Sequence, residues 1–340
     1  MRTLIIYLPC VHTWEGGYNK QNKEELDVPI KVKSFMGYLG FEMRKIMPKL
    51  SSRMYLELQS SLRRKKYIEY AKIRSKMDMI YPVYVAVETI NRCNGSCAFC
   101  PANHFNEKRP YAKMTDEIFE KILREISTWE DWNGVFSLYV NNEPFIDNRM
   151  VELLHKSRIA LPKATMLLFS NGTLLTIDIM KKIARDVDVM YINNYSESYE
   201  LHDNIKDIYN YVKSHESEFE NIDILIQKRY VKEVLTNRAG ESPNKQKAIN
   251  SIDDICMVPY TDLTIYPNGQ VGLCCSDVLE KMNFGNVQNE TLLNIYNGKE
   301  MREIRDKMTN GRKNIPICSN CDFMDSGIRI NMIENQLRNL

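Results

Sequence analysis

Three cysteines that follow an apolar run constrain this chain more than any other feature. Residues 83–90 are mostly apolar and predict a buried strand, and Cys93, Cys97 and Cys100 come directly after it with the spacing C-x3-C-x2-C. Three thiolates on one loop can hold three corners of a cubane iron–sulfur cluster, which usually has four cysteine ligands. The fourth iron is then open to another ligand. A zinc site with His104 as the fourth ligand is the alternative.

Composition indicates a soluble protein of about two domains. The chain has 340 residues, 44% of them hydrophobic, and a net charge of +2 that favours no partner class and gives no reason to expect nucleic acid. Nine cysteines, several at C-x-x-C-type spacings and without a secretory signal, favour metal ligation in a reducing compartment over disulfides. No apolar run approaches the ~18 residues of a membrane span. We therefore expect a cytoplasmic protein.

Short apolar runs alternate with amphipathic segments from Pro82 onward. This alternation predicts βα units and a parallel sheet, and about six units fit a partial (β/α)6 barrel better than a full eight-fold one. Thr115 is the expected N-cap of the first long helix. The expected strands are Val83–Ile90, Val135–Val140, Thr165–Ser170, Val187–Asn193 and Ile222–Ile226, with further helices over Arg149–Ile159, Thr176–Arg185 and Asp203–Val212.

The cysteine loop resembles that of the radical S-adenosylmethionine (radical SAM) enzymes, in which the open iron binds the methionine end of the cofactor. A second segment, Asn141-Asn142-Glu143-Pro144, is similar to the Gly-Gly-Glu-Pro turn with which that family binds the methionyl amino group. Here asparagine replaces both glycines. Asparagine tolerates positive φ better than other non-glycine residues, so the resemblance implies a similar turn and cofactor contact.

Three further sites are expected near the cofactor. The segment Ser170-Asn171-Gly172 ends the third expected strand and resembles the family's Thr-Asn-Gly segment near the ribose. Ser196, at the end of the next strand, is a possible ribose contact. Arg238 matches a position that lies near the cofactor in relatives with an auxiliary cluster, and a salt bridge at the barrel mouth is its alternative role.

The C-terminal third carries a second cysteine array. Cys256, Cys274, Cys318 and Cys321 can complete the coordination of one cubane cluster, or alternatively a tetrahedral zinc site. A hairpin turning at 267–269 precedes Cys274, and a helix over Leu292–Met308 precedes Cys318. This segment resembles the auxiliary-cluster extension called SPASM, or "twitch" in its shortened form. Because no cysteine follows Cys321, the short form with one auxiliary cluster is favoured.

These features predict three regions. Residues 1–80 form a basic, mainly helical extension, with 13 Lys and Arg against four Asp and Glu between Lys31 and Asp78, and we expect its helices to pack on the catalytic domain. Residues 81–245 form the radical SAM core, and residues 246–340 form the auxiliary-cluster domain.

The resemblance implies two 4Fe–4S clusters, S-adenosyl-L-methionine, and an electron donor such as flavodoxin or ferredoxin. A 5′-deoxyadenosyl radical would abstract hydrogen from a C–H bond, and the second cluster would accept the remaining electron, which oxidises a small polyol or sugar-like substrate. The alternatives are a peptide-modifying maturase, an epimerase with the Cys275 thiol as hydrogen-atom donor, and a non-catalytic iron–sulfur or zinc scaffold.

Overall fold

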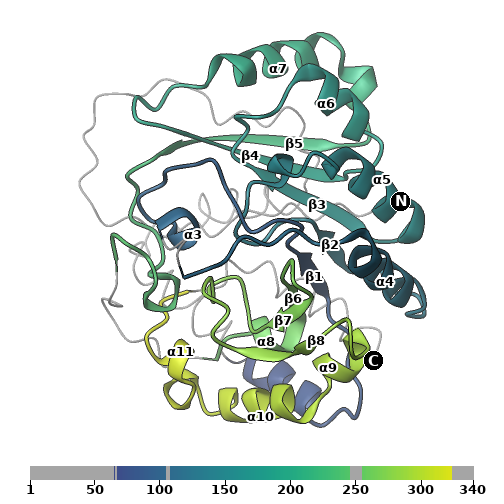
Figure 1. Ribbon diagram of the computed structural model, residues 1–340, viewed down its shortest axis with the longest axis vertical. Coiled ribbons are helices and arrows are strands. Elements are labelled where there is room, and N and C mark those ends of the chain that lie inside the picture. Colours follow the sequence, from purple (N-terminus) through teal and green to yellow (C-terminus); the bar gives the residue numbers. More distant parts are fainter. Residues whose placement is uncertain (1–64, 66, 105–107, 246–254, 324–340) are drawn as a thin grey trace, which may run out of the picture.

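One mixed sheet forms the centre of the molecule (Figure 1). A computed structural model describes residues 65, 67–104, 108–245 and 255–323. Within these residues the strand order is β5-β4-β3-β2-β1-β6-β7-β8. The strands are β1 Tyr84–Val87, β2 Val135–Ser137, β3 Thr165–Ser170, β4 Val189–Ser196, β5 Asp223–Tyr230, β6 Asp262–Ile265, β7 Gln270–Gly272 and β8 Asn283–Asn286.

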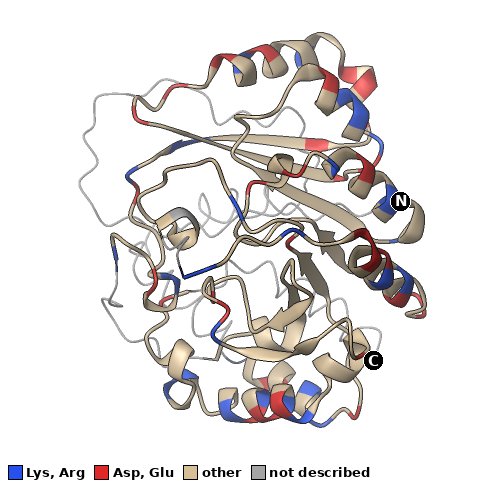
Figure 2. Cartoon of the chain, viewed as in Figure 1, with Lys and Arg blue, Asp and Glu red and all other residues tan. Residues whose placement is uncertain are grey.

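Strands β1 to β5 are parallel and neighbour one another in chain order, which confirms the expected α/β architecture. Helices cover the outer face of this half of the sheet (Figure 1). They are α4 Asp116–Ser127, α5 Met150–Ala160, α6 Ile177–Ile183 and α7 Asp203–Ser214, whereas the short helix α3 Pro101–His104 lies apart from them, directly after the cysteine loop. Charged residues of both signs lie along the outer sides of these helices, whereas the central strands carry few (Figure 2).

Local sequence explains why α4 starts where it does. The Thr115 hydroxyl accepts a hydrogen bond from the Ile118 amide at 3.4 Å, which satisfies one of the free N–H groups of the first turn. The apolar residues of the helix recur at helical spacing and are all buried against the sheet, namely Ile118, Phe119, Ile122, Leu123 and Ile126. Thr176 caps α6 in the same way, by accepting from the Ile179 amide. The Thr115 cap was expected from the sequence, whereas Thr176 was expected to be the first residue of its helix.

The sixth parallel strand does not follow β5 in the sheet. In the described part of the chain, β6 pairs in parallel with β1, at the edge of the five strands that lies opposite β5. Val85 lies in register with Leu263, and Val87 with Ile265. Because β1 is buried and its backbone needs partners on both sides, a strand from the C-terminal segment completes it. The partial barrel therefore consists of five consecutive βα strands and one strand contributed from beyond residue 255, instead of six consecutive units.

The C-terminal segment extends the sheet with an antiparallel hairpin. Strands β6 and β7 are joined through the expected turn, in which Gly269 has a φ of 81°. The helix expected over Leu292–Met308 is interrupted: α9 spans Leu292–Tyr296 and α10 spans Lys299–Met308. A Cβ atom at Gly298 would lie 2.9 Å from the Asn294 carbonyl oxygen, so the chain turns there at a residue without a side chain. Short helices α8 Val258–Thr261 and α11 Pro316–Ser319 complete this part.

A helix over residues 67–75 packs on the C-terminal segment. Tyr70 and Ala71 are fully buried in an apolar cluster that includes Tyr260 and Met301. Arg74 donates a hydrogen bond to the Tyr260 carbonyl at 3.0 Å. This helix therefore contacts the C-terminal segment, while Met77 and Ile80, which follow it, pack on the main core. The expectation for residues 1–64 lies outside the described residues. None of the described helices is both long enough and apolar enough to cross a membrane.

Candidate active site at the carboxyl ends of the strands

A cavity opens at the carboxyl ends of β1 to β5, where parallel α/β barrels place their chemistry. Most of the residues expected near the first cluster and the cofactor line it, although they come from four separate loops. They are Cys93, Cys97, Cys100, Asn141, Asn142, Glu143, Ser170, Asn171 and Arg238. Pro144 and Ser196 are not among the lining residues.

The cysteine loop presents three partly buried thiols to this cavity. Burial raises the pKa of Cys93 to about 11 and that of Cys97 to about 12, so without a bound cation both thiols hold their protons at neutral pH. A Cβ atom at Gly95 would lie 3.4 Å from the Cys93 sulfur and 3.8 Å from the Cys97 sulfur, so the loop backbone passes close to both. Three thiols facing one cavity fit a site-differentiated iron–sulfur cluster, which needs three cysteine ligands and one open position.

A single metal ion has no prepared site here. Across the described residues, no three His, Cys, Asp or Glu side chains are grouped closely enough to bind one ion. His104, the expected fourth ligand in the zinc alternative, lies exposed at the end of α3 and does not line the cavity.

Glu143 ties the second loop to the third. Its carboxylate is almost fully buried and accepts hydrogen bonds from the Ser170 hydroxyl at 2.8 Å and from the Asn171 amide at 2.7 Å. Burial raises the pKa of Glu143, and these hydrogen bonds oppose that shift. Pro144 is buried and begins a 3-10 turn, Pro144–Ile146, that directs the chain away from the cavity. The Glu143 carboxylate therefore fixes the positions of two loops that line the cavity relative to each other.

The asparagines form their turn without the left-handed conformation that the sequence comparison invoked. Neither Asn141 nor Asn142 has a positive φ. The Asn142 side-chain oxygen accepts from the Val140 amide at 3.1 Å, while its buried Nδ2 has no hydrogen-bond partner. Asn142 lines the cavity, so this unpaired donor belongs to the cavity wall.

Arg238 extends across the same wall. Its Nη1 lies 3.3 Å from the Asn141 side-chain oxygen and 3.5 Å from the Cys275 carbonyl oxygen. Arg238 and Ala239 both have positive φ, at 49° and 56°, a conformation that is uncommon for non-glycine residues. The strained backbone directs a cation toward the boundary between the barrel and the C-terminal segment.

The second cysteine array gathers beside this boundary. Burial raises the pKa of Cys274 well above its ordinary value, and the neighbouring cysteines Cys275, Cys321, Cys318 and Cys256 raise it further. Three of the expected ligands border the apolar cluster that also contains Tyr70 and Tyr260, namely Cys256, Cys274 and Cys318. Cys321 follows α11, where its amide donates to the Cys318 carbonyl at 3.0 Å. The charge on each of these four thiols influences the others, and four cysteines in one place fit the full coordination of one cubane cluster.

Cys275 contributes its backbone to the site. Its carbonyl oxygen accepts a hydrogen bond from the Asn141 side-chain amide at 3.0 Å. Its side chain packs beside Ala86, Val140 and Tyr266, and Cys275 is not among the residues that line the cavity.

Strand β4 supplies cavity residues that sequence reasoning missed. Asn193 and Tyr195 line the cavity, whereas Ser196, the expected ribose contact, accepts a hydrogen bond from the Glu200 amide at 2.9 Å and does not. Successive side chains of a strand point to opposite faces, so residues 193 and 195 share one face and residue 196 lies on the other. This alternation of side chains was the sequence signal that could have identified Asn193 and Tyr195. Tyr139, Phe169 and His202 also line the cavity.

Comparisons with known proteins agree with this architecture. Residues 87–239 match the family model of the radical SAM superfamily, and residues 256–322 match SPASM, an iron–sulfur cluster-binding domain. The S-adenosyl-L-methionine-dependent 2-deoxy-scyllo-inosamine dehydrogenase of Niallia circulans is 21% identical over 252 residues, which span 72% of this chain and 94% of that enzyme.

Two solved structures share the fold. The crystal structure of BtrN in complex with AdoMet and 2-DOIA superposes with a TM-score of 0.62 at 20% identity, over 72% of this chain and 95% of BtrN. BtrN in an open conformation gives a TM-score of 0.53 at 17% identity, over 72% and 94% of the two chains. Residues 87–239 therefore carry a radical SAM domain, and residues 256–322 carry a SPASM-type iron–sulfur cluster-binding domain.

Proposed function

We propose that this enzyme oxidises an alcohol of a small polyol or sugar-like substrate, using S-adenosylmethionine and two 4Fe–4S clusters. The observation that carries the proposal is a hydrogen bond that joins the cavity wall to the segment of the second cysteine array. Asn141 lines the cavity and donates to the carbonyl of Cys275, the residue next to Cys274. A substrate in this cavity lies beside the segment that holds an electron acceptor.

Two sets of cysteines hold the clusters in this proposal. Cys93, Cys97 and Cys100 bind the catalytic cluster, and the second cluster is bound by Cys256, Cys274, Cys318 and Cys321. When bound, the reduced first cluster and S-adenosylmethionine supply the radical that removes hydrogen from a C–H bond, and the second cluster supplies an acceptor for the remaining electron. The radical SAM core then spans residues 81–245, and the auxiliary-cluster domain spans residues 246–340. Residues 1–80 form the extension that precedes them.

The chain's own residues position the cofactor and shape the cavity. Glu143 fixes the turn and the Ser170-Asn171 segment relative to each other through two hydrogen bonds. The unpaired Nδ2 of Asn142 provides a donor for the cofactor. Arg238 places a cation beside the substrate space, and the aromatic side chains of Tyr139, Phe169 and Tyr195 limit the access of water.

The arrangement favours oxidation over the alternatives. Similarity to a dehydrogenase over 94% of that enzyme's length supports an oxidoreductase over a non-catalytic iron–sulfur or zinc scaffold. Epimerisation needs a hydrogen-atom donor at the substrate, and Cys275 faces an apolar cluster instead of lining the cavity. We further propose reduced flavodoxin or ferredoxin as the electron donor. The cytoplasm is the proposed location, because a reducing compartment preserves cluster-ligating thiols.

Product analysis tests this function directly. Anaerobically reconstituted protein is incubated with S-adenosylmethionine, dithionite and a panel of polyols and aminocyclitols, with 2-deoxy-scyllo-inosamine as the first member. We expect 5′-deoxyadenosine together with a product two mass units lighter than the substrate. A product of unchanged oxidation state that carries solvent deuterium would replace the dehydrogenase proposal with an epimerase. Turnover only with peptides would replace it with a maturase.

A further inference from the structure

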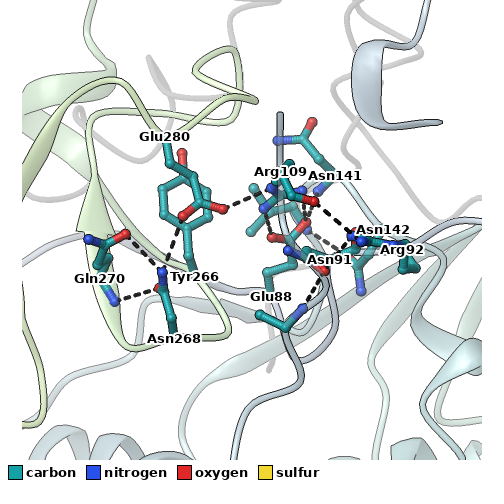
Figure 3. A network of polar contacts seen from close by, with 12 residues as sticks. Glu88, Asn91, Arg92, Arg109, Asn141, Asn142, Tyr266, Asn268, Gln270 and Glu280 are labelled. Carbon is teal, nitrogen blue, oxygen red and sulfur yellow. Dashed lines mark hydrogen bonds and ion pairs between the residues drawn. The ribbon is translucent and has the colours of Figure 1, made fainter. Parts of the chain in front are cut away.

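A buried arginine connects the barrel to the C-terminal segment (Figure 3). Glu88 lies just beyond the end of β1, five residues before Cys93, and has no exposed surface. Arg109, which is 3% exposed, donates from Nη1 to one Glu88 oxygen at 3.2 Å and from Nη2 to the other. Its Nε donates to Glu280, on the segment that follows Cys274, at 2.8 Å.

The arginine is held on all sides. Its guanidinium carbon lies 5.5 Å from the centre of the Tyr266 ring, a cation–π distance. The three nitrogens described above all face carboxylates, and the Tyr266 ring adds a contact with the guanidinium group. A planar guanidinium can contact two carboxylates at once, which a lysine ammonium cannot do with the same geometry.

The Glu88 carboxylate also contacts the turn at Asn141 and Asn142, which is expected to contact the cofactor. Glu88 accepts a hydrogen bond from the backbone amide of Asn141 at 3.1 Å, in addition to those from Arg109. Asn141 in turn donates from its side chain to the Cys275 carbonyl. Glu280, Arg109, Glu88, Asn141 and Cys275 thus form a ring of contacts that starts and ends in the segment after Cys274.

Electrostatics make this ring of contacts sensitive to loss of the Arg109 charge. Burial raises the pKa of Glu88, and the charge and hydrogen bonds of Arg109 oppose that shift. A buried carboxylate that loses such a partner either stays charged at high cost or takes up a proton. If it takes up a proton, the carboxylate that accepts from the Asn141 amide becomes a neutral carboxyl group, although none of the cysteines is touched.

We propose that Arg109 is a positioning residue that sets the spacing between the two cysteine arrays by bridging Glu88 and Glu280. The inference rests on the proposed function, because it presupposes that both arrays hold clusters. Its consequence is that hydrogen abstraction and electron acceptance remain coupled only while this bridge is intact.

Four variants test the bridge. Glu280→Ala removes the contact between Arg109 and the C-terminal segment, together with a longer hydrogen bond from Asn268 within that segment, and leaves the Glu88–Arg109 pair in place. Glu280→Gln keeps an oxygen that accepts from Arg109 and serves as the conservative rescue. Arg109→Met removes both contacts. Arg158→Met is the matched control, because the described partners of Arg158, namely Asp188, Asp186 and Ala164, all lie within the barrel.

The first readout is the magnetic coupling between the two reduced clusters in electron paramagnetic resonance, which needs neither substrate nor turnover. We expect Glu280→Ala and Arg109→Met to weaken or broaden this coupling at full iron content, and Glu280→Gln and Arg158→Met to match the unmodified protein. The second readout is the ratio of 5′-deoxyadenosine to oxidised product. It should rise at least about tenfold in Glu280→Ala, the order of effect seen when outer-shell support is removed. A general loss of folded protein would lower both products without changing their ratio.

The outcomes separate the two proposals. If the unmodified protein binds only one cluster or forms no oxidised product, the proposed function fails. If it binds two clusters and oxidises substrate, but Glu280→Ala changes neither the magnetic coupling nor the product ratio, the positioning role of Arg109 is wrong.

Discussion

The side-chain amide of Asn141 donates to the backbone carbonyl of Cys275 at 3.0 Å, across a separation of 134 residues in the chain. One residue belongs to the turn expected to contact S-adenosylmethionine, and the other adjoins a ligand of the second cysteine array. The cavity that the first array lines and the segment that carries the second array, which look like independent features of the sequence, are therefore in direct contact. This contact helps to fix the distance between the two cysteine arrays in the folded chain.

The first prediction concerns the three cysteines of the catalytic loop. Replacing Cys93, Cys97 and Cys100 together with alanine should remove about four irons per chain, because one cubane loses all its protein ligands. Iron analysis should still find the other four, and reductive cleavage of S-adenosylmethionine should stop. Cleavage that survives the triple replacement would place the catalytic cluster elsewhere.

A second prediction concerns the unpaired donor of Asn142. In the Asn142→Ala variant the orphaned Nδ2 disappears, but so does the acceptor for the Val140 amide. These changes offset, so the free energy of unfolding should change by less than about 1 kcal/mol. Affinity for S-adenosylmethionine, measured by calorimetry on reconstituted protein, should fall about tenfold, because a ligand loses a buried donor.

Asn133→Ala is a suitable control for this comparison, because residue 133 lies in a loop before β2 and does not line the cavity. Unchanged cofactor affinity in Asn142→Ala would show that Nδ2 serves no ligand. Undetectable binding by the unmodified protein at millimolar cofactor would remove the whole cofactor assignment.

The third prediction concerns acid stability. Burial raises the pKa of Asp147, but hydrogen bonds from Arg149 and Lys113 lower it more, so its pKa lies below the ordinary value of 3.8. A carboxyl whose pKa is lower in the folded state adds stability above pH 3.8, and this contribution disappears as the pH falls through the folded-state pKa. Urea unfolding of the metal-free chain should show Asp147→Asn to be destabilised at neutral pH. The difference from the unmodified chain should shrink below pH 3.8, whereas a difference that is constant with pH would contradict the assignment.

The sequence is sufficient to predict elements whose signal is local. Strand β3 has the expected bounds, and Thr115 caps α4, because side-chain period and capping chemistry are encoded within a few residues. The cysteine loop was also located correctly, directly after β1. These features need no knowledge of distant partners.

Features that depend on distant pairing were not predictable in the same way. The pairing of β6 with β1 joins residues that are almost 180 positions apart, and an apolar run gives no indication of which edge it completes. Arg109 has no sequence signal at all, because its importance comes from burial between Glu88 and Glu280. Ser196 was chosen for its place at a strand end, but the alternation of side chains directs Asn193 and Tyr195 into the cavity instead.

The last prediction separates oxidation from epimerisation through Cys275. Its carbonyl oxygen accepts from Asn141, and its side chain lies beside Ala86, Val140 and Tyr266. Alanine at this position keeps the carbonyl and removes the thiol. If the thiol has no chemical role, oxidised product should form at a rate within about twofold of the unmodified enzyme, as expected for a small change outside the reacting groups. An epimerase that uses this thiol would lose its inverted product in the variant and, before substitution, would place solvent deuterium on the inverted carbon. Turnover of both proteins in deuterated water therefore decides the role of Cys275, and we expect an oxidised, unlabelled product from each.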